Sequence, residues 1–235
     1  ALNEGKETLN KPIYFEAEND DGTVEVAMQW STSYSTNSVM AFANNINTHE
    51  GGTHLDGFKQ AVTRTINEYA RSKGILKEKD SNLSGDDTLE GCAAIVSVKR
   101  PDPQGAGQTK TKLGNTEIRP LVQNAVTQGL AEYLEENPTP AKRIIGKATQ
   151  ALKAREAARK ALNLDDRPLV LSFGGSLGAA ALNKAAAYML GESAKEKKYQ
   201  HIHGYGQHDE KFLDEVHAAG VKEEENPQIR MLEYI

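Results

Sequence analysis

The sequence predicts two parts, an antiparallel α+β part followed by the opening of a parallel α/β sheet. Near the start, two strand patterns joined by Asn-Asp-Asp-Gly indicate an antiparallel hairpin over residues 12–30. Further along, residues 169–190 run from a continuous apolar stretch through a Gly-rich turn into an Ala-rich helix pattern, an order typical of parallel sheets. A chain of 235 residues has room for one large domain or two small ones.

The first part opens with strands. Residues 12–18 and 24–30 each alternate apolar and polar side chains, which predicts two half-buried strands. A third strand is expected over residues 38–46. After a polar loop, Phe58, Val62, Ile66 and Tyr69 recur at helical spacing, with Gly74 as a stop signal. This pattern predicts one amphipathic helix.

The next segment alternates loops with regular elements. Residues 78–88 are rich in polar and Gly residues and are expected to form a loop, whereas residues 92–98 are apolar and β-branched and predict a strand buried in the sheet. Residues 101–115 combine glycines with Lys110 and Lys112, which indicates a cationic loop. Thr116 can then cap a helix whose apolar stripe runs to Leu134.

A basic helix is expected from about Ala141, after a Pro-containing break at residues 137–140. Between residues 141 and 160 the only acid is Glu156, against seven basic residues, Lys142, Arg143, Lys147, Lys153, Arg155, Arg159 and Lys160. The whole chain has 28 Lys and Arg against 33 Asp and Glu, a net charge of −5, which excludes a uniformly basic nucleic-acid binder. A local patch on this helix is compatible with that balance, as is a simple solvated face.

The second part continues as a parallel unit. After the strand at 169–173 and the turn at 174–178, a helix is expected over residues 179–190, then a strand at 199–203. A second helix at 209–219 and a third strand at 229–235 complete the pattern.

The cysteine content and the hydropathy of the sequence indicate in which cellular compartment the protein is expected. Cys92 is the only cysteine, so neither an intrachain disulfide nor a Cys-rich zinc site can form, which favours a reducing, cytoplasmic compartment. No apolar stretch approaches the ~18 residues of a transmembrane helix. The chain has no initiator Met, and we expect a piece of something longer.

Two His-containing motifs invite a metal interpretation. In His49-Glu50-Gly51-Gly52-Thr53-His54 the histidines are five residues apart and the Gly pair disfavours helix, unlike the zinc-protease pattern, so a structured loop is expected instead. His201 and His203, two apart on a strand, could chelate a metal but fit a structural role better. No metal site is predicted.

The turn Gly174-x-Ser176-x-Gly178 allows two interpretations. It fits the nucleophile elbow of α/β-hydrolases, with His201, His203, His208 and His217 as candidate bases, but too little chain follows for that sheet. Alternatively, a Gly-rich turn at a helix N-terminus presents backbone N–H groups to a diphosphate.

Three motifs in the first part carry a family resemblance. They are Asn47-Thr48-His49-Glu50-Gly51-Gly52-Thr53-His54, Leu83-Ser84-Gly85-Asp86-Asp87, and Gln108-Thr109-Lys110-Thr111-Lys112-Leu113-Gly114-Asn115. In this order and spacing they closely resemble the transducer domain of bacterial DNA gyrase B, from the type II topoisomerases, over about residues 1–161.

The gyrase resemblance implies a fold and roles. It implies a ribosomal-protein-S5-like α+β fold that follows an ATP-binding domain, and a Gln-Thr-Lys loop in which Gln108 and Lys110 meet the ATP γ-phosphate. The basic helix would line a DNA cavity with Lys142, Arg143, Lys147, Lys153 and Arg155. It also implies ATP and Mg²⁺ bound by a separate domain, and gyrase A, DNA and a second copy of the chain as partners.

The second part resembles another family. Arg167-Pro168-Leu169-Val170-Leu171-Ser172-Phe173-Gly174-Gly175-Ser176-Leu177-Gly178-Ala179, then Leu182-Asn183 and His201-Ile202-His203-Gly204, look like the start of the C-terminal domain of MurG, the UDP-N-acetylglucosamine transferase of peptidoglycan synthesis. The resemblance covers about residues 155–235. It implies a partial Rossmann-like unit of GT-B type, a UDP-sugar diphosphate at Gly174, Gly175, Ser176 and Gly178, and a link to a membrane surface.

The two resemblances together suggest a chimera. We expect residues 1–161 to form a gyrase-B-like transducer domain and residues 162–235 a partial MurG-like, nucleotide-sugar-binding domain. The expected function is a topoisomerase module that is not catalytic alone. The alternatives are a glycosyltransferase fragment and a true fusion with a binding role of its own.

Overall fold

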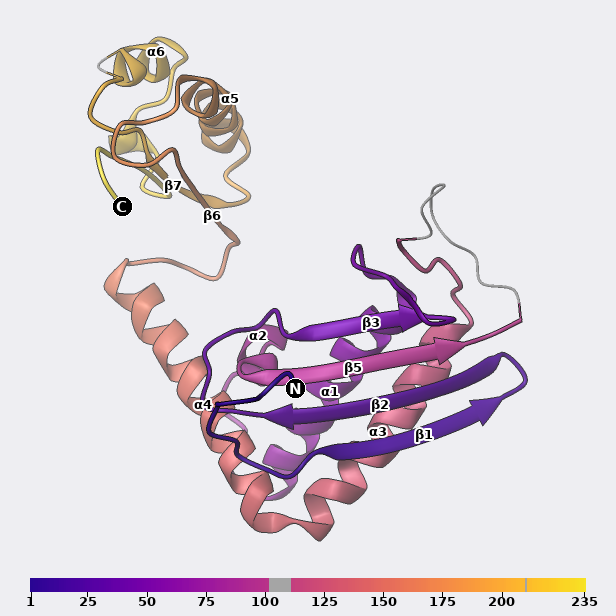
Figure 1. Ribbon diagram of the computed structural model, residues 1–235. Helices are drawn as coiled ribbons and strands as arrows, with labels where there is room; N and C mark the ends of the chain where they lie inside the picture. Colours follow the sequence, from indigo (N-terminus) through magenta and orange to yellow (C-terminus); the bar gives the residue numbers. More distant parts are fainter. Residues whose placement is uncertain (102–110, 210) are drawn as a thin grey trace. The chain divides into compact units, whose positions relative to one another are not determined.

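Five strands form one sheet in the first part of the chain, in the order β1-β2-β5-β3-β4 (Figure 1). The computed structural model describes residues 1–101, 111–209 and 211–235. The described chain divides into two units, residues 1–155 and 156–235. The strands of the first unit are β1 (Ile13–Asn19), β2 (Gly22–Trp30), β3 (Val39–Ala43), β4 (Ile46–Asn47) and β5 (Cys92–Lys99).

The register follows the predicted alternation. β1 and β2 pair antiparallel through the Asn19–Gly22 turn, which confirms the expected hairpin. β5 lies between β2, its antiparallel partner, and β3, its parallel partner, so it is a central strand as expected. Because alternate residues face one side, Val24, Val26, Met28 and Trp30 of β2 are all buried.

Two helices cover one face of this sheet. Figure 1 shows α1 (Thr53–Ser72) and α3 (Ile118–Glu136) packed side by side behind the strands. Phe58, Val62 and Ile66 of α1 are buried at helical spacing, as the apolar stripe predicts. The core of the unit lies between these helices and the sheet.

α4 (Pro138–Ala161) follows α3 and crosses the end of the sheet where β2 finishes and β5 begins (Figure 1). It begins at Pro138, three residues before the predicted start, since a proline is tolerated in the first turn of a helix, where its missing N–H has no partner to lose. Ile144, Ile145, Ala148 and Leu152 bury its inner side against the core.

Three local expectations are wrong. The single strand expected at 38–46 is a hairpin, because Asn44 and Asn45 adopt positive φ (47° and 66°) and turn the chain between β3 and β4. The expected loop at 78–88 runs into a short helix, α2 (Gly85–Leu89). The N-cap of α3 is Glu117 rather than Thr116, with no side-chain cap.

The second unit contains three parallel strands in the order β6-β7-β8, as the sequence pattern predicts. They are β6 (Leu169–Phe173), β7 (Gln200–Gly204) and β8 (Ile229–Leu232), with α5 (Ala180–Glu196), α6 (Phe212–Ala218) and a 3-10 turn, η1 (Glu223–Glu225), between them. A small core joins Leu190, Phe212, Val216, Ile229 and Met231. Leu171 and Phe173 of β6 remain 50% and 59% exposed. Among the described residues of both units, no helix is long and apolar enough to cross a membrane.

Candidate functional site

Residues 111–115 are fastened to the N-terminal end of α1. Thr53 N–H donates to Leu113 O (3.1 Å) and Leu113 N–H donates to Gly51 O (3.2 Å), around a parallel bridge between Gly52 and Leu113. Gly52 has a φ of 143°, and a Cβ there would lie 2.5 Å from Leu113 O, so this approach requires glycine. The predicted structured loop at residues 49–54 therefore binds the segment that follows residue 110 through backbone hydrogen bonds.

Arg100, just after the end of β5, is also held in place by hydrogen bonds. The side-chain amide of Asn44 donates to Arg100 O (2.7 Å), and its Oδ1 accepts from Arg100 N–H (2.8 Å). The Arg100 guanidinium pairs with Glu117, whose carboxylate also accepts from Asn115 Nδ2 (3.1 Å). Hydrogen bonds from its own backbone N–H, from Asn115 and from Arg100 hold the pKa of Glu117 below its usual value. We call the contacts around Arg100, Leu113, Asn115 and Glu117 the loop base.

Gln108 and Lys110, the two residues expected at a γ-phosphate, lie outside the described residues. The described residues that flank this part of the chain, Arg100 before it and Asn115 and Glu117 after it, are joined in the loop base. The ends of the segment are thus held at one place on the first unit.

His54 has a structural environment. Its Nε2 lies 2.9 Å from Thr48 Oγ1, whose single hydrogen goes to Ala41 O (2.9 Å), so the imidazole donates from Nε2 and its buried Nδ1 has no partner in the described chain. Burial lowers the pKa of His54 to about 4. Among the described residues no group of three or more His, Cys, Asp and Glu side chains could hold a metal ion.

The short helix α2 is clamped to α4. Asp87, 3% exposed, accepts from Ser84 N–H (2.8 Å) while Ser84 Oγ accepts from Asp87 N–H (3.2 Å), a reciprocal capping box. The same carboxylate accepts from Arg155 Nη2 at 2.9 Å. Two turns earlier on α4, Lys147 Nζ lies 3.4 Å from Glu90 Oε2. Asp87 in the middle of α2 and Glu90 directly after its last residue thus both bond to α4.

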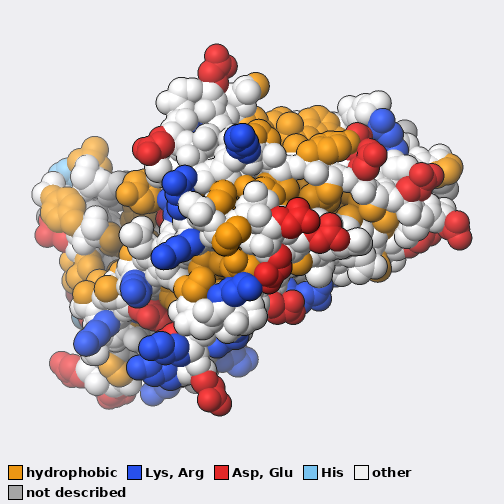
Figure 2. Space-filling model, turned by 90° about the horizontal axis from the view of Figure 1, so that it is seen from below, with side chains coloured by type: hydrophobic (Ala, Val, Ile, Leu, Met, Phe, Trp, Pro, Cys, Tyr) orange, Lys and Arg blue, Asp and Glu red, His pale blue; other side chains and the backbone are white. Residues whose placement is uncertain are grey.

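The five predicted DNA-contacting cations divide into two groups. Lys147 and Arg155 pair with acids of their own unit, although the Arg155 side chain is still 43% exposed, and Lys142, Arg143 and Lys153 are exposed on α4. Figure 2 shows several Lys and Arg side chains (blue) close together on the face that it draws. The exposed cations are available to an anionic partner.

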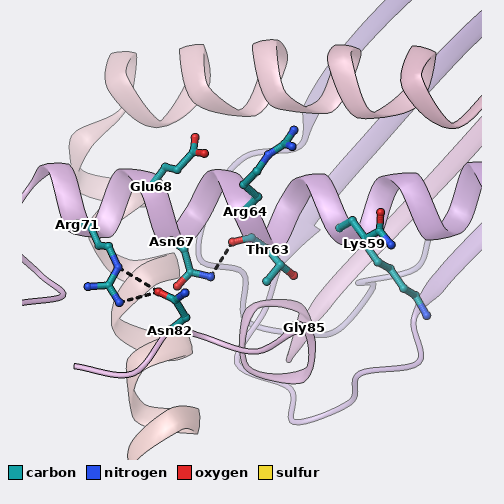
Figure 3. Close-up of a pocket in the computed structure, with 9 residues that line it drawn as sticks. Lys59, Thr63, Arg64, Asn67, Glu68, Arg71, Asn82 and Gly85 are labelled. Atoms are coloured by element: carbon teal, nitrogen blue, oxygen red, sulfur yellow. Dashed lines mark hydrogen bonds between the residues drawn. The ribbon is translucent and has the colours of Figure 1, made fainter. Parts of the chain in front are cut away.

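A hollow of about 620 Å³ lies between α1 and residues 82–85 (Figure 3). Two of its polar side chains form internal hydrogen bonds: Arg71 donates to Asn82 Oδ1 (2.6 and 3.0 Å) and to the carbonyls of Lys77 and Asp80, and Asn67 donates to Leu83 O. These bonds hold the segment before α2. We interpret this hollow as structural.

The glycine turn of the second unit lies between β6 and α5. Gly175 and Gly178 have φ of 81° and 78°, and a Cβ on Gly178 would lie 2.4 Å from Tyr205 O. Ser176 is exposed, and its carbonyl accepts from Gln207 N–H (3.0 Å). The N-cap of α5 is Ala179, which offers no side-chain cap, so Gly174–Gly178 lead into a helix end with open N–H groups.

The strand histidines bond to Ser172, not to Ser176. Asn183 Nδ2 donates to Asp209 Oδ2 (2.7 Å), so its Oδ1 accepts from His203 Nε2 (2.7 Å). Ser172 then donates to His203 Nδ1 (2.8 Å) and accepts from His201 Nε2 (2.7 Å). Burial lowers both pKa values, that of His201 to about 4. Because His201 and His203 bond to Ser172, they do not act as bases for Ser176, as the hydrolase interpretation requires.

Sequence reasoning missed several residues of these networks. Asp87 was detectable, because Ser84-x-x-Asp87 has the spacing of a capping box. Glu90, Arg100 and Glu117 carry no such local signal, because the residues of their ion pairs are 57 and 17 positions apart in the sequence.

Comparisons with known proteins match the first part of the chain. The sequence model of the DNA gyrase B family matches residues 1–164. DNA gyrase B of Streptococcus pneumoniae serotype 4 is 52% identical over 161 residues, which are 68% of this chain and 25% of that protein. DNA gyrase B of Mycobacterium tuberculosis strain H37Rv is 48% identical over 181 residues, which are 77% of this chain and 27% of that protein. The chain therefore spans about a quarter of the length of these relatives.

Two solved structures are also similar to part of this chain. The 43K ATPase domain of Thermus thermophilus gyrase B, in complex with an aminocoumarin, superposes with a TM-score of 0.64 at 44% identity, covering 69% of this chain and 43% of that chain. The ATP binding domain of Francisella tularensis topoisomerase IV gives 0.55 at 28% identity, covering 61% and 39%.

Proposed function

The chain belongs to the DNA gyrase B family, and from this premise we infer that residues 1–161 act as the transducer module of an ATP-driven type II topoisomerase. One observation carries the proposal: β5 joins the loop base to the α2–α4 clamp. The strand starts at Cys92, two residues after Glu90, and ends at Lys99, one residue before Arg100. It is hydrogen-bonded to neighbours on both sides. A close-packed central strand transmits a displacement at one end to the other rather than absorbing it.

At the loop base, the proposed partner is an ATP-binding domain. A lysine is a compact point charge suited to a terminal phosphate, so we assign Lys110, with Gln108 beside it, to the γ-phosphate of ATP bound by that domain. Mg²⁺ is assigned to the ATP-binding domain too.

At the α4 end, the proposed partner is DNA. Lys142, Arg143 and Lys153 are exposed cations on one helix, and a polyanion gains affinity from each phosphate that such side chains neutralise. Gyrase A and a second copy of this chain complete the proposed assembly. In it, ATP binding at the loop base and DNA at α4 influence each other through β5.

The test joins the ATP-binding domain of a gyrase B relative to this chain and measures steady-state ATP hydrolysis. Lys110→Ala should lower kcat strongly, because a charge that stabilises the transition state is lost. Lys112→Ala is the matched control, since Lys112 is an exposed cation two residues away. Equal activity of the two variants would remove Lys110 from the mechanism. The chain without that domain should hydrolyse no ATP.

A second candidate function concerns residues 162–235. The turn Gly174, Gly175, Ser176 and Gly178, which joins β6 of a parallel sheet to the uncapped N-terminus of α5, favours a diphosphate ligand. We assign it to UDP-N-acetylglucosamine, as in a MurG-like glycosyltransferase that works at a membrane surface. Titration calorimetry with UDP tests this. Loss of the binding heat in Gly175→Glu supports it, whereas no heat with the parent chain refutes it. No sugar transfer is expected from so partial a site.

A further inference from the structure

The second unit contains two fully buried histidines, His201 and His203, on β7. Ser172 Oγ, from β6, lies 2.7 Å from His201 Nε2 and 2.8 Å from His203 Nδ1. His203 Nε2 lies 2.7 Å from Asn183 Oδ1, from α5. These hydrogen bonds therefore join β6, β7 and α5 at one point. We call Ser172, Asn183, His201 and His203 the histidine network.

β6 has few other attachments. Within the described chain it is an edge strand whose ladder partner is β7. None of its five residues is buried, and Leu171 and Phe173 are exposed. The described core of the unit, which joins α5, α6 and β8, includes no residue of β6. The two hydrogen bonds of Ser172 are therefore a large part of what holds β6 to the unit beyond its backbone ladder.

The network fits neutral imidazoles. His201 carries its proton on Nε2 and donates it to Ser172, and its buried Nδ1 has no partner in the described chain. A second proton on His201 would therefore place a charged N–H where it meets no acceptor, which is costly in the interior of a protein. A second proton on His203 would go to Nδ1 and displace the hydrogen that Ser172 donates there. Either proton breaks the pattern of hydrogen bonds.

The groups around the pair oppose a charge most strongly at His201. The titratable and charged groups on the elements packed against the pair are Tyr199 of β7, Asp209 ahead of α6, and Glu192 and Glu196 of α5, which act on Tyr199. The residues of β8 in register with the two histidines, Ile229 and Met231, are apolar. Burial lowers the pKa of His203, although Asp209 favours its proton, whereas burial and the charge of His203 together lower the pKa of His201 to about 4.

We propose that the histidine network is an acid-sensitive switch for β6: with neutral imidazoles it holds the strand in the sheet, and a proton on His201 releases the strand while β7, β8, α5 and α6 stay packed. The release is local because the described core of the unit excludes β6. When β6 leaves, His201 meets water and regains its ordinary pKa of 6.5, so the released form takes up the proton first as the pH falls. β6 is therefore fully held above pH 6.5 and is released progressively between pH 6.5 and about 4.

Hydrogen exchange of the full chain, followed by mass spectrometry, tests the switch strand by strand. The protection factor of an amide compares its exchange rate with that of an unstructured chain at the same pH. For the β6 amides that bond to β7, this factor should fall about 30-fold from pH 8 to pH 5, as one proton with pKa values of 6.5 and about 4 in the two forms requires. The amides of α5 and β8 should keep their protection.

Three variants identify the groups responsible. His201→Gln removes the titratable ring and keeps an N–H near the position of Nε2, so the protection of β6 should become nearly independent of pH in this range. His217→Gln is the matched control, because His217 is an exposed histidine of the same unit, and it should keep the pH dependence of the parent chain. Ser172→Ala should lower the protection of β6 about tenfold or more already at pH 8, since two buried ring nitrogens lose their partner.

Three results would overturn the proposal. The first is equal protection of β6 at pH 8 and pH 5 in the parent chain, and the second is an unchanged pH dependence in His201→Gln. The third is an equal loss of protection in β6 and β8, which would mean that the whole unit unfolds and no single strand is released. Should His201→Gln fail to fold, NMR of the imidazole nitrogens in the parent chain decides: at pH 8 a His201 proton on Nε2 supports the switch, and one on Nδ1 contradicts it.

Discussion

Gly52→Ala should destabilise the first unit well beyond the usual effect of a surface substitution. Gly52 adopts φ 143° and ψ −176°, a region occupied almost only by glycine, and an L-residue there costs about 1–3 kcal/mol. The new Cβ would also lie 2.5 Å from Leu113 O and 2.7 Å from Leu113 N. The two segments must then separate, losing two backbone hydrogen bonds of about 1 kcal/mol each. We expect a total loss of about 3–5 kcal/mol.

Gly74→Ala is the matched control for this substitution. Gly74 also has positive φ, 71°, but nothing lies within 4 Å of its Cβ position, so only the backbone term of about 1–2 kcal/mol applies. The difference between the two variants therefore measures the contact with Leu113.

Urea unfolding gives the free energies, with fluorescence of the single tryptophan, Trp30, as the probe, because it is buried in the first unit. Hydrogen exchange of the Thr53 and Leu113 amides should accelerate only in Gly52→Ala. If both alanine variants lose the same stability, the close approach at the loop base contributes nothing and the reasoning fails.

Three further outcomes are expected. Because burial lowers the pKa of His54 to about 4 while the unfolded value is 6.5, the unfolded state takes up the extra proton first. As the pH falls from 6.5 to 4, the free energy of unfolding of the first unit should decrease by up to about 1.4 kcal/mol per pH unit. Urea unfolding at a series of pH values measures this decrease, and the His54→Gln variant should lack it. Asp87→Ala should cost about 2 kcal/mol, mostly the lost cap, whereas exposed Asp86→Ala should cost little; equal losses would refute the capping argument. Limited proteolysis should cut first at residues 163–168 or in the second unit, whose β6 exposes apolar side chains, and one unfolding step shared by both units would contradict this.

Local patterns in the sequence determined most of the elements. Alternation over residues 12–30 fixed the hairpin, and the spacing of Phe58, Val62 and Ile66 fixed α1. The order of strand, glycine turn and helix after residue 168 fixed the parallel unit. These features depend on neighbours a few residues apart, where periodicity directly reports which side chains share a face.

Tertiary structure alone decided which of the predicted site residues are free to act. Arg155 pairs with Asp87, 68 residues away, and Lys147 with Glu90, 57 residues away, so two cations of the basic helix hold α2 while Lys142, Arg143 and Lys153 stay exposed. Thr53 bonds to Asn115 across 62 residues to close the loop base. Such pairs form because the order of strands in the sheet brings distant segments together, and a charge or a hydroxyl in a sequence does not indicate which distant partner satisfies it.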